Sequence, residues 1–531
     1  MVEHFVFYLA LVLVIIIAIM LANKLRIAYP ILLVIAGLLV SFIPGIPVIT
    51  IDPELIFIIF LPPLLYEAAF AVSWKEMWKL RRIITSFAFV VVFLTALSVA
   101  FAANAIIPGF SLALGFVLGG IISPPDAVSA GAILKFVKIP KNLSTVLEGE
   151  SLFNDASSLI IFRFAMVAVA TGQFVWQDAA LSFGWMVTGG VGIGILLAFI
   201  FLEVHRFFPT DVNMDTILSL VAPYLMYIVA EEVHASGVLA VVSGGLFLSV
   251  RRHQFLRTSE ARLKGANVWE SFAFLINGIV FLLIGLDLTE IMQGLADEGV
   301  SLYEAVSYGL LITAVLVAVR FLAAFGAVIV TLIMRNFIRV ASRDPGMKAP
   351  LILGWTGMRG VVSLAAALSI PLQMDNGQSF PHRHLILFIT FVVILVTLIV
   401  QGLTLPALIR KLKYSDLQDA YLSEEEAQNL LKKGMREAAF SYLHENHRDK
   451  KAENEYFRQL MDRWEQEGPA ASMHGVSDPA RAICFEVLEE QRRWLREENK
   501  NNPKIDEELV RLHLLKLDLE EERLRIGQHL S

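Results

Sequence analysis

The chain has 531 residues, 56% of them hydrophobic, and a formal net charge of −6 at pH 7. Its mean hydropathy is +0.64, and apolar runs of about twenty residues recur along the first 410 positions, which indicates a polytopic membrane protein and excludes a soluble enzyme. The single cysteine, Cys484, cannot form an intrachain disulfide.

The apolar runs predict an all-α membrane protein with roughly thirteen transmembrane helices. The first run, near Phe5–Ala22, follows an acidic start and precedes Lys24 and Arg26, so we expect a retained helix and not a cleaved signal peptide. In chain order the predicted spans are 4–22, 28–44, 53–72, 83–107, 111–134, 143–171, 179–203, 213–233, 236–250, 269–288, 303–334, 348–370 and 384–410.

The connections between spans alternate in charge. Basic residues gather at 24–26, 75–82, 135–141, 251–264 and 335–348, and acidic residues gather at 52–54, 231–232 and 287–304. Basic connections face the cytoplasm in most membrane proteins. We therefore expect a multi-pass protein of the cell membrane, with its N-terminus outside and its C-terminal tail in the cytoplasm.

Two predicted spans carry helix-breaking residues. The fifth contains Ser123-Pro124-Pro125-Asp126, and the twelfth contains Gly354-Trp355-Thr356-Gly357-Met358-Arg359-Gly360. Their separation by seven spans predicts two inverted six-helix repeats with crossed, unwound helices 5 and 12, an arrangement that marks transporter binding sites. Asp126 would offset exposed amide ends at one break and Arg359 exposed carbonyl ends at the other. The alternative is that the breaks are kinks or close helix contacts.

A polar cluster, Glu150-Ser151-Leu152-Phe153-Asn154-Asp155-Ala156-Ser157-Ser158, lies inside the sixth predicted span. A charged side chain at the centre of a membrane helix costs about 2.5–3.5 kcal/mol, so Asp155 should be paired, hydrated or functional. Ser151 and Asp155 share one helix face, and Glu150 and Asn154 share a neighbouring face. The first pair offers oxygen ligands to a small cation, whereas Glu150 can be held in a structural ion pair.

Four motifs together resemble the monovalent cation:proton antiporter family of Na⁺/H⁺ exchangers over about residues 5–412. They are Leu61-Pro62-Pro63-Leu64-Leu65-Tyr66-Glu67, Pro125-Asp126-Ala127-Val128, Glu150-Ser151-Leu152-Phe153-Asn154-Asp155 and Gly357-Met358-Arg359-Gly360. The resemblance implies a thirteen-helix fold with a dimerisation domain and a mobile core domain. It also implies a homodimer that works by elevator-like alternating access.

The resemblance also implies roles for individual residues. Asp155 would be the ion- and proton-binding carboxylate with Asn154 as its partner, and Ser151 and Glu67 would be further ligands of the transported cation. Glu150 would pair with Arg320, and Asp126 and Arg359 would stabilise the crossed helices. Pro125 stands where many relatives have threonine, so only its backbone carbonyl could contribute. Arg163 lies outside the family pattern.

A lone carboxylate in a membrane cavity can hold either a proton or a small cation, and this competition is itself an exchange mechanism. Oxygen ligands suit hard ions, so Na⁺ is the expected cargo, with Li⁺ accepted and K⁺ as an alternative. Electrogenic members of the family carry a second aspartate where this chain has Asn154, which implies an electroneutral exchange. No cofactor is expected.

Several alternatives remain open from the sequence. A passive cation channel would need a continuous polar pore, and an intramembrane enzyme would need a second catalytic group. Asp155 could pair with Arg163, although eight residues place them about 12 Å apart along a helix. Glu67, which follows the Pro62-Pro63 break, is either a ligand or an interface carboxylate. No motif for nucleic-acid binding is found.

The charged segment 414–531 is predicted to be a helical cytoplasmic tail that regulates the membrane domain, 1–413. Ser423 with Glu426 predicts a capping box, and Ser477-Asp478-Pro479 and Asn502-Pro503 predict further helix starts. Gly468-Pro469 predicts a break. Ile505, Leu512, Leu519 and Ile526 recur every seven residues, with Leu509 and Leu515 beside them, and this apolar stripe predicts a partner helix in the tail or in a second subunit.

Overall fold

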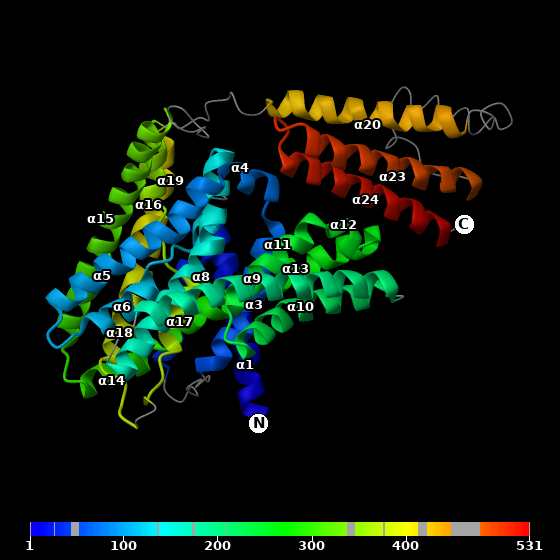
Figure 1. Ribbon diagram of the computed structural model, residues 1–531. Helices are drawn as coiled ribbons and strands as arrows, with labels where there is room; N and C mark the ends of the chain where they lie inside the picture. Colours follow the sequence, from blue (N-terminus) through cyan, green and yellow to red (C-terminus); the bar gives the residue numbers. More distant parts are fainter. Residues whose placement is uncertain are drawn as a thin grey trace. The chain divides into compact units, whose positions relative to one another are not determined.

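The computed structural model describes residues 2–25, 27–43, 53–134, 137, 139–172, 176–208, 210–336, 346–374, 377–412, 422–447 and 478–529 (Figure 1). Within these residues the secondary structure is helical, apart from an isolated bridge between Gln373 and Ser379. The contacts divide the chain into two units. The membrane unit comprises Met1–Phe207, Leu218–Arg252 and Trp269–Tyr414, and the tail unit comprises Phe208–Ile217, His253–Val268 and Ser415–Ser531.

The described residues of the membrane unit are mostly helical. The first half comprises α1 (Val2–Leu25), α2 (Tyr29–Ser41), α3 (Pro53–Ala71), α4 (Trp74–Thr85), the π-helix η1 (Ser86–Val91), α5 (Val92–Ile106), α6 (Leu112–Ile122), α7 (Ala127–Leu134) and α8 (Lys141–Thr171). The second half comprises α9 (Trp176–Phe207), α10 (Val212–Glu232), α11 (Gly237–Val250), α12 (Arg252–Phe255), α13 (Ser259–Leu286), α14 (Leu288–Asp297), α15 (Leu302–Met334), α16 (Lys348–Trp355), α17 (Val361–Leu368), α18 (Arg383–Val396), the π-helix η2 (Thr397–Gln401) and α19 (Gly402–Leu412). Both α10 and α13 begin in the tail unit, and α12 belongs to it after Arg252.

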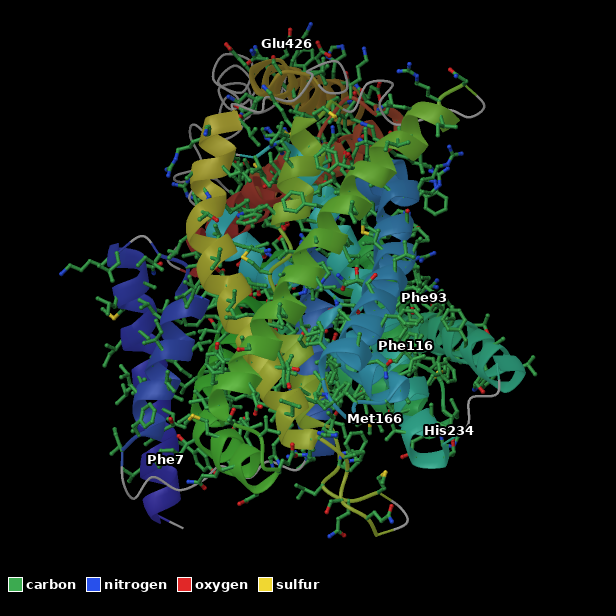
Figure 2. All side chains as sticks on the ribbon, turned by 90° about the vertical axis from the view of Figure 1, so that its left-hand side faces the viewer. Phe7, Phe93, Phe116, Met166, His234 and Glu426 are labelled. Carbon is green, nitrogen blue, oxygen red and sulfur yellow. The ribbon has the colours of Figure 1, made fainter. Side chains whose placement is uncertain are left out.

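Nine helical stretches among the described residues have the length and composition needed to cross a membrane. They are Val6–Leu25, Trp74–Ile106, Leu112–Leu134, Lys141–Thr171, Ala180–Phe207, Val212–Glu232, Ser259–Asp297, Leu302–Ile333 and Arg383–Leu412. Three shorter apolar helices, Tyr29–Ser41, Phe57–Ala71 and Gly237–Val250, fall in further predicted spans. Exposed apolar side chains such as Phe93 on α5 suit a surface in contact with lipid (Figure 2).

The two predicted breaks are present. Residues 123–126 separate α6 from α7, and residues 356–360 separate α16 from α17. The break expected at Pro62-Pro63 is absent, because α3 continues through both prolines. Membrane helices tolerate proline where neighbouring groups satisfy the freed carbonyls, so the sequence pattern was ambiguous there.

Close helix contacts position α6 beside the helices that flank it. A Cβ atom on Gly119 would lie 2.5 Å from the Ala96 carbonyl oxygen of α5. Glycine therefore lets the backbones of α5 and α6 approach, as small residues do in membrane proteins. The same helix also contacts α8, which carries the polar cluster.

The tail unit contains three long helices, α20 (Glu424–Asn446), α23 (Asp478–Asn501) and α24 (Glu507–His529), which lie side by side (Figure 1). The capping box of Ser423 and Glu426 is present, and α23 begins at the predicted site. The start expected at Asn502-Pro503 is wrong by a few residues, because α24 begins at Glu507. Gly468-Pro469 lies outside the described residues.

The apolar face of α24 also differs from the prediction. Val510, Leu517 and Leu524 lie in the buried core of the tail unit with the Cys484 side chain. Leu512, Leu519 and Ile526 are 42%, 49% and 57% exposed, whereas Ile505 of the same predicted stripe is buried. The helix therefore carries two seven-residue apolar rows offset by two residues, or about 200° around the axis. The row that the sequence singled out is largely the exposed one.

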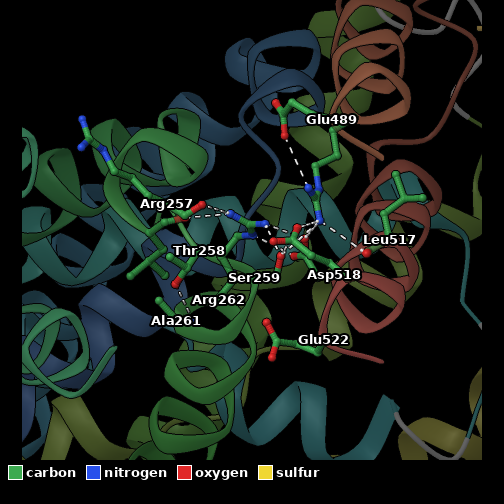
Figure 3. A network of polar contacts seen from close by, with 12 residues as sticks. Arg257, Thr258, Ser259, Ala261, Arg262, Glu489, Leu517, Asp518 and Glu522 are labelled. Carbon is green, nitrogen blue, oxygen red and sulfur yellow. Dashed lines mark hydrogen bonds and ion pairs between the residues drawn. The ribbon is translucent and has the colours of Figure 1, made fainter. Parts of the chain in front are cut away.

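A buried charge network joins α24 and α23 to the start of α13 inside the tail unit (Figure 3). Arg262 contacts Asp518 at 2.6 Å, and Arg492 contacts Asp518 at 2.9 Å and Glu521 at 2.6 Å. The Ser259 hydroxyl donates to Glu521 at 2.5 Å. The tail thus binds a segment that precedes it by more than two hundred residues of sequence.

Candidate functional site

The two interrupted helices meet at their breaks. The Asp126 backbone N–H donates to the Met358 carbonyl oxygen at 2.7 Å, which links the loop after α6 to the loop after α16. The Asp126 carboxylate accepts from the backbone N–H groups of Val128 (2.9 Å) and Ser129 (3.3 Å) and from the Ser129 hydroxyl (2.5 Å). Asp126 therefore caps the amide end of α7, where a negative charge is favoured.

Arg359 binds carbonyl groups at the end of α6, the helix before the first break. Its buried guanidinium donates to the carbonyl oxygens of Ile122 (2.7 Å) and Ser123 (3.1 Å) at the end of α6, and to the Gly357 carbonyl oxygen in its own loop. The Arg359 backbone N–H donates to the Thr397 hydroxyl at 3.2 Å. The side chain thus satisfies carbonyl groups that a broken helix leaves without intrahelical partners.

The α8 cluster binds the first of these loops from the side. Ser151 Oγ accepts from the Ala127 backbone N–H at 3.1 Å, and Asn154 Nδ2 donates to the Pro125 carbonyl oxygen at 3.0 Å. The buried Asn154 Oδ1 has no hydrogen-bond partner in the part of the chain that the structure describes. The structure therefore brings Ser151, Asn154, Pro125 and Asp126 together at the α6–α7 break.

Asp155 lies beside this arrangement. Its side chain is buried, with a residue exposure of 7%, and it interacts electrostatically with Asp126. Among the described residues, none donates a hydrogen bond to its carboxylate or forms an ion pair with it. A carboxylate in these surroundings can take up a proton or ligate a cation through its oxygen atoms.

Glu150, on the neighbouring face of α8, has a different environment. Arg320 of α15 forms a two-point ion pair with it, one contact through Nη1 to Oε1 and one of 2.8 Å through Nη2 to Oε2. Arg320 Nε also donates to the Leu353 carbonyl oxygen at 3.3 Å, at the end of α16. The pair thus connects α8, α15 and the helix before the second break.

Glu67 is half-buried on α3, a helix that contacts α8 and α17. Both Glu67 and Asp126 interact electrostatically with Tyr29, at the start of α2. These interactions place Glu67 near the crossing. Tyr29 was missed in the sequence, where nothing separates it from an interfacial tyrosine.

Arg163, one of the open questions of the sequence, binds Glu231 at 2.6 Å. Glu231 also accepts from the Gly237 backbone N–H at 2.9 Å, so the pair connects α8 to the turn between α10 and α11. The possible pairing of Arg163 with Asp155 is therefore not the one observed.

Two further groups at the site come from π-helices that the sequence did not predict. Ser157 of α8 donates to the Ala88 carbonyl oxygen of η1 at 2.5 Å, and Thr397, which binds the Arg359 backbone, begins η2. π-Helical turns free backbone groups and recur at functional sites. Apolar sequence carries no signal for them, whereas Ser129, three residues after Asp126, could have been found as a capping partner.

Comparison with known proteins places these features in a family. A family model described as sodium/hydrogen exchanger, transmembrane, matches residues 10–411. A sodium, potassium, lithium and rubidium/H(+) antiporter of Bacillus pumilus (strain SAFR-032) is 34% identical over 417 residues, which are 77% of this chain and 61% of the relative. The chain therefore spans about three fifths of that relative's length. The Na(+)/H(+) antiporter ApNhaP of Aphanothece halophytica is 33% identical over 389 residues, 73% of this chain and 70% of the relative.

Among solved structures, the chain is similar to the sodium proton antiporter MjNhaP1 from Methanocaldococcus jannaschii. The TM-score is 0.59 at 18% sequence identity, and the likeness covers 76% of this chain and 98% of that chain. At this identity the likeness concerns the fold, which is that of an all-helical polytopic membrane protein.

Proposed function

Because this chain belongs to the sodium/hydrogen exchanger family, whose members are transporters and not enzymes, we propose that it exchanges Na⁺ or Li⁺ for H⁺ across the cell membrane. Transport would be electroneutral, one cation for one proton. The site would be exposed alternately to the two sides by an elevator-like movement of one helix bundle against another within a homodimer.

One observation carries the proposal: the buried Asp155 carboxylate has neither an ion pair nor a hydrogen-bond donor among the described residues, at the crossing of two interrupted helices. By contrast, Asp126 and Glu150 are already engaged by helix amides and by Arg320. Asp155 is thus the carboxylate of the cluster with free oxygens, and a proton and a cation would compete for them.

Further oxygen ligands are close by. Ser151 Oγ accepts one hydrogen bond and retains a lone pair, and the Pro125 carbonyl oxygen and Asn154 Oδ1 belong to two residues that are joined at the break. Glu67 would complete the site if the bundle movement brings α3 closer. Asn154 cannot carry a second proton, which is the reason for expecting one charge in each direction.

The proposal also covers the number of membrane passes, their orientation and the role of the tail. Thirteen membrane passes in two inverted repeats would consist of the nine long stretches, the three shorter apolar helices, and the pair α16 and α17. The positive connections would put the N-terminus outside and the tail in the cytoplasm. The tail would adjust the rate or the pH range of exchange, because the ion-site residues all precede Lys413.

A K⁺/H⁺ exchange is the second candidate, because the Bacillus relative is named for sodium, potassium, lithium and rubidium. Dye-reported proton flux in proteoliposomes, challenged in turn with Na⁺, Li⁺ and K⁺, distinguishes the two cargoes. A passive cation channel would conduct without moving protons. Exchange that responds to an imposed membrane potential would contradict the one-for-one stoichiometry.

Asp155→Asn tests the site. The amide keeps size and one oxygen but cannot exchange a proton, so cation-dependent proton flux should vanish while the folded protein remains. Glu232→Gln, which removes an exposed carboxylate at the end of α10, is the matched control and should keep its flux. Coupled flux retained by Asp155→Asn would refute the assignment.

Truncation after Lys413 should leave exchange with a changed rate or pH profile.

A further inference from the structure

A cavity of 550 Å³ opens along α4 and η1, on a different face of α8 from Asp155. Its wall includes Trp74, Trp78, Arg81 and Arg82 of α4, Phe89 of η1 and Phe153 of α8. Phe153 and Asp155 are two residues apart, so their side chains point about 200° apart around the helix. The cavity is therefore separate from the candidate ion site.

The lining combines an apolar wall with two guanidinium groups. Ile84, Val90 and further apolar side chains cover most of it, whereas Arg81 and Arg82 are exposed. An occupant that matched this lining would carry a negative group and an extended apolar body. A small inorganic anion would leave the apolar wall in contact with water.

One of the arginines is already fixed in position. Arg81 Nη1 donates to the Trp78 carbonyl oxygen at 2.6 Å, and its guanidinium lies 4.7 Å from the centre of the Trp78 ring. The Trp78 ring in turn stacks on Trp74, with centroids 5.5 Å apart. Stacking leaves other guanidinium donors directed away from the rings, so an anion could bind without reordering the side chain.

The helix that carries these residues has the composition of a membrane boundary. Its buried side contains Met77, Leu80 and Ile84, and it forms the first part of the apolar stretch Trp74–Ile106. Tryptophan and basic residues at the end of a membrane helix lie at the level of lipid head groups. A ligand supplied by the membrane would meet the cavity at that level.

We propose that this cavity binds an anionic phospholipid. The head-group phosphate contacts Arg81 and Arg82, and one acyl chain lies along Ile84, Phe89, Val90 and Phe153. Charge complementarity selects the anionic lipid, because a zwitterionic head group brings a positive charge to the same two arginines. The bound lipid bridges α4 and η1 to α8.

The experiment measures lipid retention by the purified full-length protein in detergent with native mass spectrometry. Dioleoyl phosphatidylglycerol and dioleoyl phosphatidylcholine compete at equal concentration, so that only the head group differs. A basic residue near an anionic surface favours binding by about fivefold, so Arg81→Gln with Arg82→Gln should reduce the preference for phosphatidylglycerol roughly 25-fold. Arg81→Lys with Arg82→Lys keeps both charges, so this variant should retain most of the preference for phosphatidylglycerol.

The matched control is Arg410→Gln with Lys411→Gln, which removes two adjacent exposed charges at the end of α19, away from the cavity. This variant should keep the preference. Val90→Trp keeps both arginines but fills the apolar wall, and it should lower retention of both lipids. An unchanged preference after loss of Arg81 and Arg82, unchanged retention in Val90→Trp, or displacement of the lipid by inorganic phosphate would each overturn the proposal.

Discussion

At the scale of single residues, Glu150 and Arg320 place opposite charges where water is excluded. Their side chains are 1% and 2% exposed. Burying a charge costs several kcal/mol, and the partner and the Leu353 carbonyl offset that cost only while the pair is intact. The arrangement explains why two charged side chains in apolar helices can be structural, while the neighbouring Asp155 has no ion-pair partner in the described part of the chain.

Removing either partner should therefore destabilise the protein. We expect Glu150→Ala or Arg320→Ala to lower the free energy of unfolding by about 3–5 kcal/mol, because each leaves a buried charge without its counterion. Thermal unfolding in detergent measures the loss. The double alanine variant should be no worse than either single one, and simple additivity would argue against direct coupling.

A surface pair provides the control for that cycle. Arg206 and Glu203 lie 3.6 Å apart with side-chain exposures of 64% and 24%. Exposed pairs contribute about 0–1 kcal/mol, so their alanine variants should unfold close to the temperature of the parent protein.

At the scale of elements, the crossing depends on how closely the two broken helices approach. Gly360 is the N-cap residue of α17, and a Cβ atom there would overlap the Asp126 carboxylate. Gly360→Ala should push the loops apart, weaken the cap on α7 and reduce both stability and cation-dependent flux. Thermal unfolding and the proteoliposome assay measure the two effects together.

Gly326→Ala is the matched substitution. Gly326 lies inside α15, and apart from the backbone of its own helix no heavy atom comes within 4 Å of its added Cβ. Alanine is favoured over glycine in a helix interior by about 0.5–1 kcal/mol, so this variant should be neutral or slightly more stable. If Gly360→Ala behaved in the same way, the close approach would not matter to the crossing.

The sequence predicted what local chemistry determines. Proline and glycine beside a charge identified both breaks, and Ser423 with Glu426 identified a helix start, because these signals act within a few residues. The polar run on α8 singled out Asp155 because charge is expensive in apolar surroundings.

Apart from the pairing of Glu150 with Arg320, which the family resemblance implied, partners across the fold needed the structure. That Arg359 would bind carbonyl groups of α6 as well as its own loop depends on the register of the crossing, which no local pattern encodes. The uninterrupted α3 shows the reverse case, in which surrounding helices override a local breaker. The α24 helix carries two apolar rows, and the row that contains Val510 is the one buried in the core of the tail unit.

At the scale of the whole molecule, the tail unit is assembled from separate stretches of chain, and Arg262 connects them. Arg262→Gln should loosen the unit, because Asp518 then loses its ion pair with the start of α13 and keeps the one with Arg492. Labelling of Cys484 measures this loosening. Burial raises the pKa of its thiol to about 12, so the thiol should react slowly with thiol reagents while the tail unit is folded.

Losing a charged hydrogen bond costs about 1.5–3 kcal/mol, so labelling of Cys484 through the opened tail should accelerate by roughly tenfold or more. Arg257→Gln, which removes the exposed arginine five residues earlier, should label at the parent rate. Equal rates in the two variants would mean that the network does not hold the tail closed.

The tail unit should also respond to acid through His513. Burial, with the charges of Lys516 and Lys432, lowers the pKa of this histidine below 6.5. The unfolded tail then binds more protons than the folded one, so stability falls as pH drops through 6.5 towards the folded pKa. Glu521 does not contribute in this range: burial opposes its charge, but Ser259 and Arg492 outweigh burial and hold its pKa below the ordinary value.

Limited proteolysis of the tail at neutral and mildly acidic pH measures this response. His513→Gln has no titrating group at that position, so its susceptibility should change less between the two conditions. A variant as acid-sensitive as the parent would assign the response to other residues.

The contact between Arg262 and Asp518 also sets the order in which the protein can be made. The two residues are 256 positions apart, so Asp518 leaves the ribosome well after Arg262. The membrane helices between them must be synthesised before the contact can form, so the start of α13 waits through that interval without its acidic partners. Packing of α24 against the start of α13 is therefore a late step of biogenesis. A nascent chain released before Asp518 is made would carry Arg262 without its ion-pair partner.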